Sequence, residues 1–485
     1  MKKSLLISKL LKDSTWSMIS TFANKISFVI VGILVARFLG AENFAIFAII
    51  QSVVIMLANV FSQSITTATS KHIAEYINES LYKVSAGAAI TFLFSLSFAV
   101  LIFFISSMFP SYFSQYLLFH SNYIKYVDDT TYIIMLTIGL GWAQGVFAGF
   151  RAFKLNAFIN ILYASFSVIL AFVLTSLYGI DGAFKSIIAT QCIIFILSLL
   201  CIKKLFRKKN IAISFRGAWG EKSAITLVGL PVFLTGIIVA PITWYSNKLL
   251  SVLSDGLVQL AIFSASMQWS SLFTQVSVVL GTVLIPILAS NKDNKNNSLE
   301  KVNFYSSWLF TVVFTIPLII FVDFFIKIYG KVQLIDDFKI SVSFVLFSAI
   351  LTSFKSGIAR KIIVLNLSWF SVLSNLGWAF MFIILSLYAR SYGAVGITGA
   401  LFFSQLLHFL ITTPYFLKRK IVDKSLFFNR YVIMLSIIPF LSLYFSFCVD
   451  NKWVKIASCI SLVLFALFES FVLLKSKKVG IYEEK

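Results

Sequence analysis

The sequence predicts an all-α polytopic membrane protein with about fourteen transmembrane helices, arranged as two pseudo-symmetric six-helix lobes and two C-terminal helices. Composition is the first observation behind this fold class, because 59% of the 485 residues are hydrophobic and only 12% are charged, about half the charged fraction of soluble domains. The apolar residues also form blocks long enough for helices that cross a bilayer and too long for the strands of a membrane barrel. An internal repeat is the third observation.

The apolar blocks define the expected helices in order along the chain. Six blocks precede a basic segment, six follow it, and two more end the chain; polar residues interrupt the fourth and the tenth. We expect helices at residues 14–38, 44–68, 84–108, 130–150, 155–178, 182–202, 222–250, 258–289, 302–328, 338–359, 368–389, 394–417, 430–449 and 453–474.

Lysine and arginine are distributed unevenly between the segments that join these helices. If the N-terminus lies in the cytoplasm, 29 of the 41 Lys and Arg residues fall in cytoplasmic segments and 6 in outer loops. The positive-inside rule therefore predicts that both termini are cytoplasmic. The same distribution explains the net charge of +22 without a nucleic-acid partner.

Short motifs recur at a nearly constant spacing. Residues 178–182 (YGIDG), followed by Gln191, match residues 392–396 (YGAVG), followed by Gln405, at a spacing of 214. Because six helices separate the copies, the lobes should be parallel and related by an axis along the membrane normal. We therefore predict an N-terminal lobe at 1–202, a basic cytoplasmic linker at 203–221, a C-terminal lobe at 222–417, and an extra helix pair with a cytoplasmic tail at 418–485.

Polar side chains form one stripe on the second expected helix and another on the eighth. Their spacing of three, four and seven residues places each set on one helical face, and an offset of 216 superposes Ser52 on Gln268. A hydrated cleft lined by both lobes explains the stripes, and so do hydrogen bonds between packed helices; the match across the repeat favours the cleft. The cleft-lining residues would be Thr21, Ser52, Asn59, Gln63, Thr66, Ser264, Gln268, Ser271 and Gln275.

A few charged residues lie inside the expected helices. Lys25 lies near the middle of the first helix, where a lysine costs at least about 2.5 kcal/mol by insertion scales, so we expect a water-filled cavity or a partner around it. Lys248 and Lys355 lie nearer to helix ends. Extension of the side chain to the membrane surface explains these two lysines as well as a functional role does. Asp323 and Lys327 are four residues apart, which predicts a local ion pair.

Motifs of catalysis and metal binding are absent from the sequence. It has no phosphate-binding GxxxxGK[ST] motif, its three histidines are far apart, and its four cysteines show no CxxC spacing, so the cysteines are best interpreted as packing residues. No pair of carboxylates indicates a shared acid–base site. We therefore expect a protein that is not an enzyme and that holds no metal or cofactor.

The N-terminal region resembles a known family. Residues 12–16 (KDSTW), 32–44 (GILVARFLGAENF) and 71–76 (KHIAEY) are similar to the N-terminal signature of bacterial polysaccharide-lipid flippases. These are the O-antigen and capsule repeat-unit exporters of the multidrug/oligosaccharidyl-lipid/polysaccharide superfamily. The similarity is strongest over about the first 80 residues, and the two-lobe layout extends it over the first twelve expected helices.

The resemblance implies a lipid-linked substrate. An undecaprenyl-diphosphate-linked oligosaccharide repeat unit would pass from the cytoplasmic to the periplasmic leaflet of the bacterial inner membrane by alternating access. Lys25, Lys248 and Arg37 would bind the diphosphate, and the polar stripes would bind the sugars. Outward transfer of each negative charge gains about 2.3 kcal/mol per 100 mV of inside-negative potential, and antiport of H⁺ or Na⁺ would add to it. Membrane lipids and the polysaccharide polymerase machinery would be further partners.

Three other functions share parts of this pattern. A lipid II flippase shares the fold and the fourteen helices, although the opening signature favours a repeat-unit exporter. A multidrug or cation antiporter would favour an acidic cleft, whereas the charges inside these helices are mainly cationic. An oligosaccharide polymerase or ligase usually carries a long outer loop with arginines and histidine, which this sequence lacks.

Overall fold

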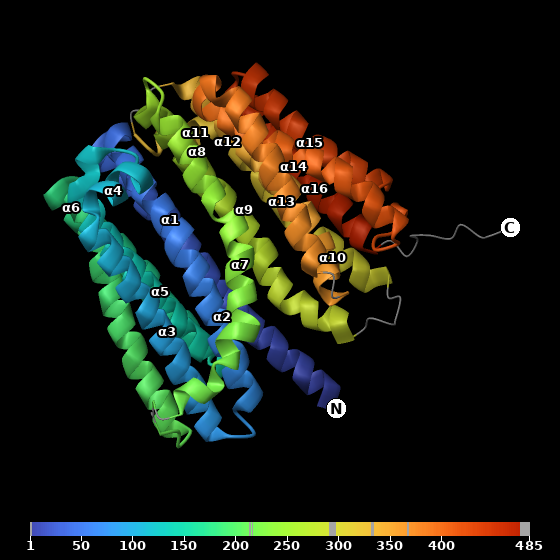
Figure 1. Cartoon of the computed structure of the whole chain (residues 1–485). Helices are drawn as coiled ribbons and strands as arrows, with labels where there is room; N and C mark the ends of the chain where they lie inside the picture. Colours follow the sequence, from blue (N-terminus) through green and yellow to red (C-terminus); the bar gives the residue numbers. More distant parts are fainter. Residues whose placement is uncertain are drawn as a thin grey trace. The chain divides into compact units, whose positions relative to one another are not determined.

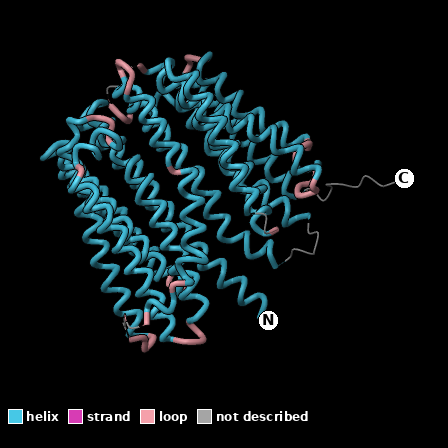
Figure 2. Tube along the Cα trace, viewed as in Figure 1, coloured by secondary structure: helices cyan, strands magenta, loops and turns pink. Residues whose placement is uncertain are grey.

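The structure is a computed structural model that describes residues 2–212, 215, 217–290, 297–330, 334–365 and 368–475. These residues form helices joined by short turns, with no strand among them (Figure 2). The prediction of an all-helical polytopic membrane protein is therefore confirmed. The helices form two compact units, which divide the chain between Ala261 and Ile262.

The first unit is a bundle of long helices in which α6 packs along α1, and α5 packs on α2, α3 and α6 (Figure 1). Small residues bring α5 close to α2. A Cβ atom on Gly141 would lie 2.0 Å from Ser62 Oγ, and one on Gly149 would lie 2.6 Å from Ile73 Cβ. The elements of this unit are α1 (Lys2–Val54), η1 (Ile55–Asn59), α2 (Val60–Tyr76), α3 (Leu81–Met108), α4 (Pro110–Tyr112), η2 (Phe113–Leu117), η3 (Ser121–Tyr126), α5 (Val127–Gly149), α6 (Phe153–Lys208), η4 (Ala218–Glu221), η5 (Ile225–Gly229), α7 (Leu230–Val239), α8 (Pro241–Ser251) and the start of α9 (Gly256–Ser290).

The second unit contains the rest of α9 and the helices that follow it. Its core lies around α10, which packs on α12, α15 and α16 and buries Tyr305, Leu435 and Ala466. The elements are α10 (Asn297–Ile320), α11 (Val322–Lys327), α12 (Ile335–Val364), α13 (Ser368–Ala389), η6 (Arg390–Tyr392), α14 (Gly393–Lys418), η7 (Lys424–Leu426), α15 (Arg430–Cys448) and α16 (Lys452–Lys475).

Nine segments of the described residues are long and apolar enough to cross a membrane. Three of them, Ile19–Tyr76, Phe153–Lys208 and Val372–Lys418, have 58, 56 and 47 residues, more than twice the about 20 residues that one crossing needs. Each of the three contains a glycine with a positive φ, of 76° at Gly40, 62° at Gly179 and 59° at Gly393, which breaks the helix there because residues with a Cβ rarely adopt this conformation. The count of fourteen crossings stays a prediction.

The predicted lobe boundaries follow the sequence repeat, whereas the compact units follow packing. The helices over residues 222–251 pack on the first unit, where α7 contacts α2 and α8 contacts α1. Trp244 Nε1 of α8 also donates to the Leu117 carbonyl at 3.1 Å. The predicted division into 1–202, 203–221, 222–417 and 418–485 stays a prediction.

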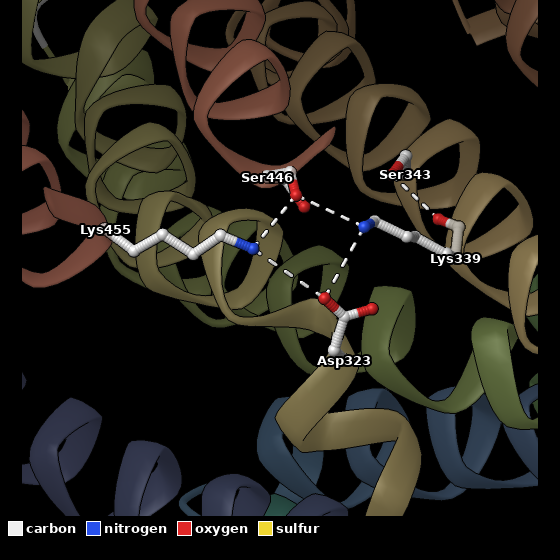
Figure 3. Close-up of polar contacts among 5 residues, drawn as sticks. All are labelled: Asp323, Lys339, Ser343, Ser446 and Lys455. Carbon is white, nitrogen blue, oxygen red and sulfur yellow. Dashed lines mark hydrogen bonds and ion pairs between the residues drawn. The ribbon is translucent and has the colours of Figure 1, made fainter. Parts of the chain in front are cut away.

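One carboxylate joins the final helix pair to the rest of the second unit. Asp323 Oδ2 of α11 lies 3.5 Å from Lys339 Nζ of α12 and 3.8 Å from Lys455 Nζ of α16. Both lysines also donate to the Ser446 carbonyl at the end of α15 (Figure 3). The predicted ion pair between Asp323 and Lys327 was therefore wrong: Asp323 faces lysines that are distant in sequence, and Lys327 is exposed.

Candidate substrate site

Lys25 lies inside the apolar segment Ile19–Tyr76 and is half-buried in the first unit. Its Nζ atom is 5.9 Å from the centroid of the Phe28 ring, one turn further along α1. Among the described residues, the ion pairs are His72–Glu221, Lys339–Asp323, Lys361–Glu300 and Lys455–Asp323, so no carboxylate of that part of the chain balances Lys25. A cation without an acidic partner inside a membrane helix is suited to an anionic ligand.

A cluster of amide side chains joins α1 to α6, and one of its members, Asn24, precedes Lys25 in the sequence. Asn24 Nδ2 donates to Asn160 Oδ1 at 2.8 Å, and Asn160 Nδ2 donates to Ser20 Oγ at 2.7 Å and to Asn156 Oδ1 at 3.2 Å. The Oδ1 atom of Asn24 is buried and accepts no hydrogen bond from the described residues. Amides and hydroxyls both donate and accept hydrogen bonds, as recognition of sugar hydroxyls requires.

This amide cluster was not predicted from the sequence. Asn156 and Asn160 are four residues apart in an otherwise apolar segment, which places both on one face of the helix. That spacing was the available signal, but the partner helix could not be deduced from it.

The structure places the other two predicted head-group cations elsewhere in the first unit. Arg37 and Lys248 are both exposed, and Lys248 Nζ lies 5.5 Å from the centroid of the Trp244 ring. Arg37 is twelve residues beyond Lys25 on α1, or about 18 Å at the rise of an α-helix. The roles of the three cations stay predictions.

The first polar stripe is divided between interior and surface. Ser52 is 2% exposed, and its hydroxyl donates to the Ile49 carbonyl of its own helix at 2.7 Å. Thr66 donates to the Gly141 carbonyl of α5 at 2.7 Å. These are the contacts that helix packing, the alternative interpretation, expects. Thr21 is half-buried and Gln63 is exposed, whereas the side chain of Asn59 lies outside the described part of the structure.

The residues of the second stripe are buried or half-buried in the second unit. Gln268 is 6% exposed, and its Oε1 accepts a hydrogen bond from the Tyr329 hydroxyl at 3.2 Å. Burial raises the pKa of Tyr329 well above its usual range, so this hydroxyl stays protonated and can donate. Ser271 donates to the Gln268 carbonyl at 2.7 Å, and Ser264 and Gln275 are half-buried. The lining of a cleft by these two stripes stays a prediction.

Comparison with known sequences identifies relatives. Residues 10–292, more than half of the chain, match a family described as polysaccharide biosynthesis protein. An EPS I polysaccharide export inner membrane protein, EpsE, of Ralstonia nicotianae (strain ATCC BAA-1114 / GMI1000) is 35% identical over 81 residues, 17% of this chain and 18% of that protein. Its counterpart in Ralstonia solanacearum is 33% identical over 101 residues, 20% of this chain and 23% of that protein. The chain thus matches about a fifth of the length of these relatives.

Comparison with solved structures extends over almost the whole chain. The lipid II flippase MurJ in an inward closed conformation has a TM-score of 0.71 at 16% identity, over 95% of this chain and 99% of that one. An inward-facing multidrug resistance MATE family transporter of the MOP superfamily has a TM-score of 0.65 at 15% identity, over 84% of this chain and 96% of that one. At these identities the likeness concerns the fold, which is that of MOP superfamily transporters. The family match over more than half of the chain confirms the resemblance seen at the N-terminus and shows that the chain belongs to the polysaccharide biosynthesis protein family.

Proposed function

We propose that the protein is a flippase that moves undecaprenyl-diphosphate-linked oligosaccharide repeat units, of the O-antigen or capsule type, from the cytoplasmic to the periplasmic leaflet. The observation that carries the proposal is the polar site on α1 and α6 of a chain from this family. There, the unbalanced cation Lys25 is the sequence neighbour of the Asn24–Asn160 amide pair.

The chemistry of this site suits the two polar parts of such a substrate. The ammonium of Lys25 attracts the diphosphate, and the amides of Asn24, Asn156 and Asn160 offer donors and acceptors to sugar hydroxyls. The polyprenyl chain can stay in the bilayer while the head group passes. The membrane potential favours outward movement by about 2.3 kcal/mol per negative charge and 100 mV, and alternating access of the two lobes provides the path.

The proposed function also assigns the protein to a membrane and gives it an orientation there. It is a multi-pass protein of the bacterial inner membrane with both termini in the cytoplasm. The collection of basic residues in the segments on one side of the expected helices supports this orientation. The transport step itself needs no covalent chemistry. The polymerase that joins exported repeat units is the expected functional partner, and H⁺ or Na⁺ antiport is a further source of driving force.

A lipid II flippase is the second candidate function. It is favoured by the fold likeness to MurJ over nearly the whole of both chains, and its substrate also carries an undecaprenyl diphosphate. The N-terminal signature over residues 32–44 and the family match favour the repeat-unit exporter.

Deletion of the gene in its host, followed by glycan analysis, tests the proposal. We expect loss of surface polysaccharide and accumulation of lipid-linked repeat units on the cytoplasmic leaflet, with peptidoglycan synthesis unchanged. Arrest of peptidoglycan synthesis would instead assign lipid II as the substrate. Single repeat units on the surface without polymer would indicate a polymerase, and unchanged surface glycan would contradict the proposal.

A further inference from the structure

Lys355 is the centre of a second polar cluster, which joins three helices of the second unit. Its ammonium on α12 donates to Gln405 Oε1 of α14 at 2.7 Å, and the same Nζ atom lies 2.7 Å from Nδ1 of His408, also on α14. The other ring nitrogen of His408, Nε2, lies 2.7 Å from Ser374 Oγ of α13. His408 is 6% exposed, and both of its ring nitrogens have protein partners.

These contacts fix where the protons of the cluster lie. A lysine ammonium has three donors and no acceptor, so the Nδ1 atom that faces it must accept, and the ring proton of neutral His408 lies on Nε2, toward Ser374. Gln405 and His408 use two of the three ammonium protons. The third has no partner among the described residues and is left for a ligand.

No carboxylate balances this cluster among the described residues, whose ion pairs all lie elsewhere. Beside the cluster, α10 presents the neutral side chains of Thr311 and Trp308 to Ser353 and Phe354 of α12. The next cations on α12 already have partners, because Arg360 donates to Asn303 and Lys361 pairs with Glu300. The positive charge of Lys355 is therefore available to an anion.

Addition of a proton to His408 would change the cluster. It would turn Nδ1 from an acceptor into a donor, so the bond to Lys355 would break and two cations would face each other across the present 2.7 Å. An anionic oxygen between Nζ and Nδ1 would accept from both donors and balance the added charge. Because linkage is reciprocal, the proton would strengthen anion binding and the anion would strengthen proton binding.

We propose that Lys355, His408 and Gln405 form a binding site for the diphosphate group of the lipid-linked substrate, and that His408 takes up a proton when the diphosphate binds. The proposal rests on the proposed function and deepens it, because it assigns a head-group site to the second unit in addition to Lys25 in the first. Lys355 and His408 contact the diphosphate directly, Gln405 orients the ammonium, and Ser374 orients the imidazole.

Calorimetry of the purified full-length protein in detergent tests this assignment, with farnesyl diphosphate as the probe. Binding is measured at about pH 6.5, near the unperturbed pKa of histidine, in two buffers of different ionisation enthalpy, so that the number of protons taken up can be calculated. We expect His408→Gln, which keeps a hydrogen-bonding side chain but cannot titrate, to lower this uptake by up to about one proton. We expect Lys355→Gln to weaken binding by about tenfold or more.

The chain provides a matched control in His120→Gln, the same substitution at an exposed histidine, which should leave affinity and proton uptake unchanged. Proton uptake in His408→Gln equal to that of the wild type, or wild-type affinity in Lys355→Gln, would overturn the inference while the proposed function stands. If the wild-type protein binds no farnesyl diphosphate at all, the proposed substrate class fails, and this site fails with it.

Discussion

The turn at Gly179 in the first unit and the turn at Gly393 in the second have the same backbone conformation, with φ and ψ of 62° and −137° at Gly179 and 59° and −138° at Gly393. The glutamines that follow at the same spacing have different partners. Gln191 donates to the Thr137 hydroxyl at 3.1 Å, whereas Gln405 accepts from the Lys355 ammonium at 2.7 Å. The two copies of the repeat therefore share their backbone geometry and differ in charge.

The largest expected effect tests the shared geometry. A Cβ atom on Gly182 would lie 1.9 Å from the Leu174 carbonyl oxygen, and one on Gly396 would lie 1.9 Å from the Ala389 carbonyl oxygen. We expect Gly182→Ala and Gly396→Ala each to lower the free energy of unfolding by about 3 kcal/mol, at the upper end of the usual cost of overpacking, because a backbone atom must move.

Thermal unfolding of the detergent-purified variants measures this effect. Gly377→Ala is the control, because no atom lies within 4 Å of the position of its Cβ. If one of the two turn variants unfolds at the same temperature as this control and the other does not, the two turns are not equivalent.

The second effect tests the difference in charge. Gln405→Leu removes an acceptor from a part-buried ammonium, which should cost about 2–3 kcal/mol of unfolding free energy, whereas Gln191→Leu removes a neutral hydrogen bond and should cost about 1 kcal/mol. The same unfolding measurement compares the two variants. Equal losses would contradict the assignment of the charged cluster to the second unit.

The smallest effect concerns the final helix pair, α15 and α16. We expect Asp323→Asn to lower the unfolding free energy by only about 0.5–1 kcal/mol, because the carboxylate is 40% exposed. Hydrogen exchange should nevertheless rise at the end of α15 and the start of α16, where Lys455 loses its ionic partner. Lys327→Gln, at an exposed position, is the control, and equal exchange in both variants would contradict the role of Asp323.

Features that depend on composition and repeated motifs could be predicted from the sequence. The helical membrane fold follows from the apolar blocks, and the repeat of YGIDG as YGAVG indicated equivalent turns, because Gly179 and Gly393 both adopt a positive φ that other residues rarely adopt. The N-terminal motif indicated the family before any structural comparison. These features are local, so their signals lie in adjacent residues.

The polar contacts could not be predicted in the same way, because they depend on which helices are neighbours. Asp323 pairs with lysines 16 and 132 residues away, not with Lys327 on its own helix. Asn24 and Asn160 meet across 136 residues. Ser52 illustrates a different difficulty, because a serine in an apolar helix can satisfy its hydroxyl on its own backbone, and the spacing of a polar stripe does not reveal this.

The central claim is that this chain carries a diphosphate-linked oligosaccharide across the bilayer by means of the polar site on α1 and α6. Its most direct test is translocation of an undecaprenyl-diphosphate oligosaccharide in vesicles that contain the purified protein, measured as exposure of the sugar to a membrane-impermeant lectin. We expect transfer by the wild-type protein and its loss in Lys25→Ala at equal reconstitution. Transfer by Lys25→Ala at the wild-type rate would remove this site from the mechanism, and no transfer by the wild-type protein under an inside-negative potential would contradict the flippase function.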